Sequence, residues 1–149
     1  MYYIQTEAAF DAAHFLMGYE GKCRNIHGHR WRIVAELESE KLITTGVTRG
    51  MVCDFGDIKS DLRALADHFD HALLIEVGTL KAKTVEALEE EGFRLIFLPF
   101  RTTAENFAAY FYSELKKKGY RVARVSVYET PENCAVYTGE KEAPHIVRL

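Results

Sequence analysis

The chain has 149 residues, of which 48% are hydrophobic and 28% charged, with a formal net charge of −3. This length suits one domain over residues 1–149, and the acidic balance argues against a nucleic-acid-binding protein, which carries a basic stripe. No apolar run reaches the roughly 20 residues that cross a bilayer, no secretory signal opens the chain, and three cysteines at irregular spacing do not suggest a disulfide framework, so we expect a cytoplasmic protein.

The first part of the chain predicts two strands joined by a loop. Alternation over residues 2–14 places Phe10 and His14 on the apolar face of a strand. A loop with two glycines follows over residues 16–25, and residues 29–38 alternate again between apolar and charged side chains. This second pattern is typical of an antiparallel strand with one buried face and one wet face.

The middle of the chain predicts two helices and two short strands. Residues 44–50 form a turn region, and residues 51–53 fit a short returning strand. Asp54 is a suitable N-cap for a helix whose apolar positions follow helical spacing. These positions are Ile58, Leu62, Leu65 and Phe69. A second helix is expected over residues 81–91, and the apolar run 93–98 fits a strand.

The last part of the chain predicts a third helix followed by a β-hairpin. The stretch from Thr102 to Glu105 fits the capping-box pattern at the start of this helix, which ends at Gly119. Residues 120–129 and 134–138 fit two strands joined by a tight turn. Together the elements predict an α+β fold in which helices cover one face of an antiparallel sheet.

Three histidines fall where two predicted strands meet. His27 and His29 are two residues apart, which on a strand puts both imidazoles on one face, within reach of one ion. His14 ends the preceding strand on its apolar side and comes alongside if the two strands pair. Three neutral imidazoles suit Zn²⁺ and leave its fourth position for water or substrate. The other interpretation is that His27 and His29 are only hydrogen-bonded near the sheet edge.

Cys23 precedes His27 by four residues in a glycine-containing loop. Its neighbours Lys22 and Arg24 are cations, which favour the reactive thiolate. Two alternatives stay open for Cys23. It is either a small buried hydrophobic residue or a fourth zinc ligand that closes a structural site.

Two further positions carry groups with the chemistry of a site. The adjacent Asp70 and His71 can hold one imidazole tautomer and shuttle protons, although either residue can simply end the helix before them. Glu129 shares the parity of the apolar Val125 and Val127, and a buried carboxylate requires a donor partner. That partner is either an arginine of the chain or the two parallel N–H donors of an amino-pyrimidinone ring.

In this order, these segments resemble the 6-pyruvoyl-tetrahydropterin synthase family over most of the chain, from Phe10 to about Tyr137. The matching stretches are Phe-Asp-Ala-Ala-His at 10–14, Cys-Arg-Asn-Ile-His-Gly-His at 23–29, Asp-Phe-Gly-Asp-Ile-Lys at 54–59, Phe-Asp-His-Ala-Leu-Leu at 69–74, Thr-Ala-Glu-Asn at 103–106 and Tyr-Glu-Thr at 128–130. Each stretch alone is modest evidence, whereas their common order is specific.

The resemblance implies a tunnelling fold, whose subunits assemble through their sheets into a β-barrel, typically a homohexamer with sites at subunit interfaces. It also implies a role for each matching position. The implied roles are zinc binding for His14, His27 and His29, proton transfer for Cys23, Asp70 and His71, and pterin binding for Glu129, Thr103 and Glu105.

The spacing of Cys23 and His27 resembles the bacterial queuosine-pathway branch of the family, since the animal tetrahydrobiopterin enzyme has two more intervening residues. We therefore expect a zinc-dependent lyase that converts 7,8-dihydroneopterin triphosphate to 6-carboxy-5,6,7,8-tetrahydropterin, acetaldehyde and triphosphate. The alternatives are a 6-pyruvoyl-tetrahydropterin synthase that eliminates triphosphate without carbon–carbon cleavage, a three-histidine zinc hydrolase, and a non-enzymatic domain with a closed structural zinc site.

The chain departs from the family pattern in three places. Ile75 stands where an asparagine usually follows the Asp-His segment, and Thr102 stands where a proline often precedes Thr-Ala-Glu-Asn. Residues 77–98 are longer than the corresponding stretch of compact members, and the sequence assigns them no role.

Overall fold

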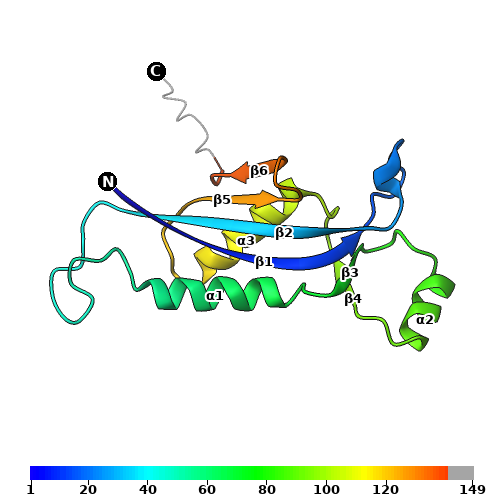
Figure 1. Cartoon of the computed structure of the whole chain (residues 1–149), viewed down its shortest axis with the longest axis horizontal. Coiled ribbons are helices and arrows are strands. Elements are labelled where there is room, and N and C mark those ends of the chain that lie inside the picture. Colours follow the sequence, from blue (N-terminus) through cyan, green and yellow to red (C-terminus); the bar gives the residue numbers. More distant parts are fainter. Residues whose placement is uncertain (141–149) are drawn as a thin grey trace, which may run out of the picture.

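Two long antiparallel strands, β1 (Tyr2–His14) and β2 (His27–Ser39), form the centre of a six-stranded sheet with the order β4-β3-β1-β2-β5-β6 (Figure 1). The computed structural model describes residues 1–140, and the expected single domain extends beyond this range. The register pairs His14 with His27. The predicted parity is confirmed, because the apolar residues of both strands line one buried face.

One edge of the sheet is antiparallel and the other is parallel. β5 (Val122–Tyr128) and β6 (Cys134–Tyr137) form the predicted hairpin beside β2. β3 (Ala72–Glu76) and β4 (Leu95–Leu98) pair in parallel, and β3 also runs parallel to β1. The expectation of a purely antiparallel sheet was therefore wrong: the sheet is mixed.

β3 was not predicted from the sequence, and its residue pattern explains why. β3 is a short and mostly buried apolar run without polar alternation, which is the pattern of a strand covered on both faces. Such a run cannot be distinguished from buried helix by periodicity alone. A parallel pair also needs a long crossover, and here the crossover from β3 to β4 contains α2 (Ala82–Glu90).

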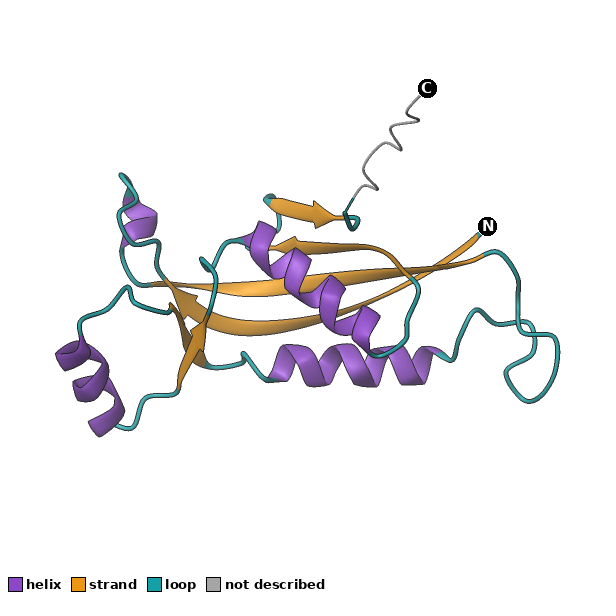
Figure 2. Cartoon of the chain, turned by 180° about the vertical axis from the view of Figure 1, so that it is seen from behind, coloured by secondary structure: helices purple, strands orange, loops and turns teal. Residues whose placement is uncertain are grey.

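Helices α1 (Phe55–Asp67) and α3 (Ala104–Lys117) cover one face of the sheet, as predicted (Figures 1 and 2). α2 lies apart from them at one end and has no buried residue. No helix within residues 1–140 combines the length and the apolarity needed to cross a bilayer.

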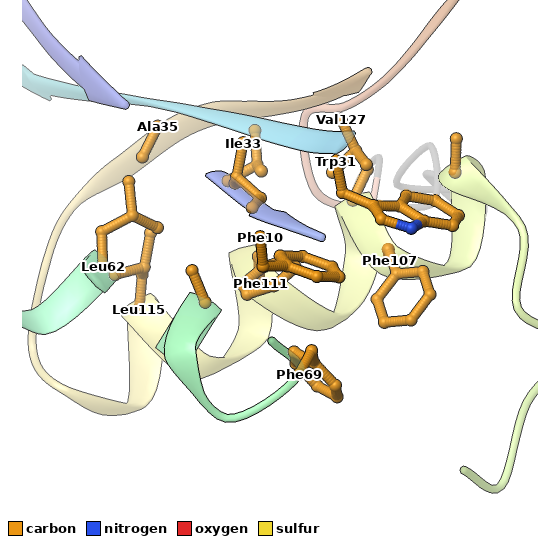
Figure 3. Packing of buried hydrophobic residues seen from close by; sticks show 14 of the residues in the cluster. Phe10, Trp31, Ile33, Ala35, Leu62, Phe69, Phe107, Phe111, Leu115 and Val127 are labelled. Atoms are coloured by element: carbon orange, nitrogen blue, oxygen red, sulfur yellow. The ribbon is translucent and has the colours of Figure 1, made fainter. Parts of the chain in front are cut away.

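An aromatic cluster joins the two helices to the sheet (Figure 3). Phe10 of β1 stacks on Trp31 of β2, with ring centroids 5.9 Å apart. Phe69, Phe107 and Phe111 close around Phe10, and all five rings are at most 1% exposed. Burying each such side chain contributes about 2–3 kcal/mol, so this cluster fixes the end of the sheet next to the histidines.

Two local expectations were wrong. Residues 51–53 form no strand. Met51 instead belongs to a loop that closes on itself, where its carbonyl accepts from the Ile43 N–H at 2.9 Å. The N-cap of α3 is Thr103, whose hydroxyl accepts from the Asn106 N–H at 3.3 Å, so the capping-box start at Thr102 is off by one residue. Thr102 is buried and has a different partner.

Candidate metal and substrate site

The three predicted histidines meet on the buried face of the sheet where β1 ends and β2 begins. Because His14 pairs directly with His27, and His29 stands two residues further along β2, the strand register alone brings their rings together. Their ring centroids lie 4.6 to 5.2 Å apart. One nitrogen of each ring lies within 4.8 Å of the other two, an arrangement that can hold a metal ion.

Hydrogen bonds to Nδ1 fix the orientation of two of these rings. His14 Nδ1 donates to the Thr102 carbonyl at 2.7 Å, with the Thr102 hydroxyl at 3.1 Å, and His27 Nδ1 donates to the Asn25 carbonyl at 2.6 Å. A proton on Nδ1 leaves the lone pair on Nε2. The Nε2 atoms of His14 and His27 are both buried without a hydrogen-bond partner.

These unpartnered nitrogens fit a metal ion. A buried polar atom without a partner is costly, and metal-ligating histidines characteristically donate their other ring N–H to a carbonyl. Burial lowers the pKa of His14 to about 4 and also lowers that of His29, so both rings are neutral near pH 7. The donor set is the one that Zn²⁺ uses in open sites.

The lowered pKa of His14 predicts a pH-dependent stability of the metal-free protein. Unfolding restores an ordinary pKa near 6.5 to His14. Between pH 6.5 and about 4 the His14 imidazole therefore binds a proton in the unfolded chain but not in the folded chain. Stability therefore falls as pH falls, and we expect a loss of about 2 kcal/mol between pH 7 and pH 5. Denaturant unfolding in the presence of a chelator measures it.

Two variants test the assignment of this pH dependence to His14. His14→Gln should flatten the slope of stability against pH. His68→Gln, which changes an exposed histidine next to α1, should leave the slope intact. If stability falls with pH equally steeply in His14→Gln and in the parent protein, protonation of His14 is not the cause of the pH dependence.

Sequence reasoning missed Thr102, which links the metal cluster to the start of α3. It is 1% exposed, and its carbonyl and hydroxyl both face His14 Nδ1. The only sequence signal was its departure from the usual proline, and a backbone carbonyl that orients a ligand leaves no trace in residue type.

The Asp70–His71 pair forms a turn that is bound to β1. Asp70 accepts from the Asp11 backbone N–H at 2.8 Å and lies 2.7 Å from His71 Nδ1. The bond from Asp11, followed by His71, lowers the pKa of Asp70 and keeps it ionised. His71 has a left-handed φ of 54°, the only such value for a non-glycine residue in the described chain. Its side chain is 79% exposed.

An open pocket of about 670 Å³ is lined by one residue of each predicted group. These are His71 of the predicted proton-transfer pair and His29 of the predicted metal ligands. Ile26, Leu88 and Phe93 make part of its wall apolar. The pocket thus offers room for a flat ring system next to His71, which is predicted to transfer a proton.

Glu129 lies on the other side of His29. Both residues line a second open pocket of about 400 Å³. Burial, and then the charge of Glu105, raises the pKa of Glu129, while His27 acts in the opposite direction. Within residues 1–140 no salt bridge or side-chain hydrogen bond engages the Glu129 carboxylate, so its donor partner is not an arginine of this range.

Cys23 and Thr103 lie on the loops around this end of the sheet. Cys23 is partly buried in the short helical turn η1 (Lys22–Arg24), and its carbonyl accepts from the Leu16 N–H at 2.9 Å. The cluster within residues 1–140 that could hold a metal ion consists of three histidines and does not include Cys23. This arrangement favours an open centre over a closed one.

The chain is similar to known proteins over nearly its whole length. The family model for 6-pyruvoyl tetrahydropterin synthase matches residues 3–140. The 6-carboxy-5,6,7,8-tetrahydropterin synthase of Haemophilus influenzae is 32% identical, over 92% of this chain and 99% of that protein. The enzyme of the same name from Synechocystis is 34% identical, over 97% and 98%.

A solved structure has the same fold. The 6-pyruvoyl tetrahydropterin synthase of Caenorhabditis elegans superposes with a TM-score of 0.65 at 26% identity, covering 93% of this chain and 96% of that one.

Proposed function

The chain belongs to the 6-pyruvoyl tetrahydropterin synthase family, and on that premise we propose that it is a zinc-dependent lyase of the 6-carboxy-tetrahydropterin branch. Its substrates are 7,8-dihydroneopterin triphosphate and one water molecule, and its products are 6-carboxy-5,6,7,8-tetrahydropterin, acetaldehyde and triphosphate. This reaction belongs to queuosine biosynthesis. The active unit is a homohexamer in which subunits join through their sheets.

One observation carries the proposal: His14, His27 and His29 each place one ligand atom within 4.8 Å of the other two, and His29 lines two open pockets. The fold presents them at the end of the sheet, and the relatives named 6-carboxy-tetrahydropterin synthase match almost end to end. The absence of Cys23 from the cluster supports an open ligand position, which a substrate needs.

His14, His27 and His29 are the residues that would hold zinc, and zinc bound there would supply Lewis acidity for the side-chain hydroxyls of the substrate. Glu129 accepts two N–H donors of the pterin ring in fork geometry and orients the side chain toward the histidines. Glu105 and Thr103 border the same end of the site.

Proton transfer in this proposal divides between two groups. Cys23 removes a proton from the substrate side chain as a general base. His71 carries the second proton, because Asp70 holds its Nδ1 and leaves Nε2 for exchange. Loss of triphosphate leaves two adjacent carbonyl groups on the side chain. A water molecule then adds to the carbonyl next to the ring, and cleavage of the carbon–carbon bond between the two groups releases acetaldehyde and leaves a carboxylate on the ring, with the water supplying its second oxygen.

The identity of the products tests the proposal. Purified zinc-loaded protein is incubated with dihydroneopterin triphosphate, and the pterin and aldehyde products are identified by mass spectrometry. We expect 6-carboxy-tetrahydropterin and acetaldehyde in equal amounts. Formation of 6-pyruvoyl-tetrahydropterin without acetaldehyde would keep the family and refute the branch, and no turnover would favour a structural zinc domain.

Replacing Glu129 tests the proposed pterin anchor. Glu129→Gln keeps the size of the side chain but turns one acceptor into a donor, which opposes the ring N–H groups. We expect KM for the pterin to rise about 10- to 100-fold, as loss of a charged hydrogen-bond pair predicts, with the zinc content unchanged. Steady-state kinetics measure it.

Glu132 provides a matched control, because it lies exposed in the same β5–β6 turn. Glu132→Gln should leave KM within twofold of the parent value. Equal KM values for both variants would remove Glu129 from the pterin site.

A further inference from the structure

The peptide group between Asp70 and His71 is held at both of its polar atoms. Its N–H, on His71, donates to the Asp11 carbonyl of β1 at 2.7 Å. Its carbonyl, on Asp70, accepts from the guanidinium of Arg94. The same guanidinium donates to the His68 carbonyl at 2.6 Å through its other terminal nitrogen.

Arg94 is itself anchored beside this turn. It lies between α2 and β4, and its carbonyl accepts from the Leu73 N–H at 2.9 Å, two residues beyond His71. The backbone bond holds Arg94 against the start of β3, while the planar fork of its side chain spans the two carbonyls at the end of α1. Residues 77–98, to which the sequence assigns no role, deliver this arginine.

We propose that Arg94 is a positioning residue that fixes the His71 imidazole for proton transfer. This inference rests on the proposed function, in which Asp70 and His71 form the proton-transfer pair. The surplus length of residues 77–98 then supplies part of the reaction machinery through one side chain.

The physical reason lies in the backbone of His71. A left-handed φ is uncommon for a residue other than glycine and costs free energy, so contacts from the surroundings help to maintain it at His71. Removing Arg94 frees the Asp70 carbonyl, so only the bond to Asp11 holds the peptide plane. Rotation of that plane turns the His71 side chain away from the pocket that it lines with His29.

The test compares the kinetics of Arg94→Ala, Arg94→Lys and Arg63→Ala. Arg63 is an exposed arginine on α1 and serves as the matched control. For Arg94→Ala we expect kcat to fall about 10- to 100-fold, because a small misplacement of a reacting group has effects of this size, with KM within threefold. Added guanidinium ion should restore part of kcat. The kcat of Arg94→Lys should fall between those of Arg94→Ala and the parent, and the kcat of Arg63→Ala should match that of the parent.

Three outcomes would overturn the positioning role. The first is a kcat of Arg94→Ala within twofold of the parent value. The second is a rise in KM at constant kcat, which would make Arg94 a substrate-binding residue. The third is a loss of zinc together with a lower thermal unfolding midpoint, which would make Arg94 merely structural. Asp70→Asn is assayed alongside. Full turnover in Asp70→Asn would refute the proposed proton-transfer pair itself, whereas loss there with an unaffected Arg94→Ala refutes the inference about Arg94 alone.

Discussion

Replacing either His27 or His29 with alanine is expected to abolish both metal binding and turnover. Each variant leaves two imidazoles, and His27→Ala also removes one of the two buried nitrogens that lack a partner. Metal affinity should fall by more than the roughly 10- to 100-fold that loss of a ligand's hydrogen-bond partner costs. Zinc per chain after dialysis, measured by mass spectrometry of the metal, reports it.

The choice of positions separates metal loss from unfolding. His27 and His29 are only partly buried, whereas His14 is 1% exposed and its removal would also leave a cavity. His68→Ala serves as the histidine control and should retain zinc and activity. Retention of zinc in both site variants would rule out the three-histidine centre.

Cys23→Ala is expected to lower kcat by about 10²- to 10⁴-fold, the range for loss of a general base, while the zinc content stays unchanged. The reason is the proposed separation of roles: three histidines supply the candidate metal ligands without Cys23, whose free thiol is then the proposed general base. Steady-state turnover and metal content are measured on the same preparation.

Cys134 is the matched control for this variant, because it is a free and exposed cysteine on β6. Cys134→Ala should turn over like the parent protein. If Cys23→Ala loses zinc together with activity, Cys23 is a ligand, and the site is closed.

The grouping of the three histidines could be predicted from sequence because it depends on strand parity. Alternation put His14 on the apolar side of one strand, and the spacing of His27 and His29 put both on one side of the next. Antiparallel pairing with this parity puts all three imidazoles on one face, and the observed register then places His14 opposite His27. The hairpin was predictable from alternation of its strands, and the apolar stripes of α1 and α3 were predictable from helical spacing.

The rest depends on contacts between distant segments. β3 lacks alternation, and its parallel partners β1 and β4 are defined only by the tertiary fold. Thr102 and Arg94 act through a carbonyl and through a side chain that reaches carbonyls, and residue type does not reveal either contact. The position of Glu129 on the same pocket as His29 likewise arises from the pairing of β5 with β2.

The most direct test of the open three-histidine centre is the visible absorption spectrum of the cobalt(II)-substituted protein, recorded for the parent and for Cys23→Ala. We expect a spectrum typical of nitrogen and oxygen ligands, without a thiolate charge-transfer band. In Cys23→Ala, which binds the substrate without consuming it, added dihydroneopterin triphosphate should shift the cobalt bands. The open centre would be contradicted if the parent protein shows a thiolate charge-transfer band that is absent from Cys23→Ala, and if the pterin leaves the cobalt spectrum unchanged. Those two results together would identify a closed structural site.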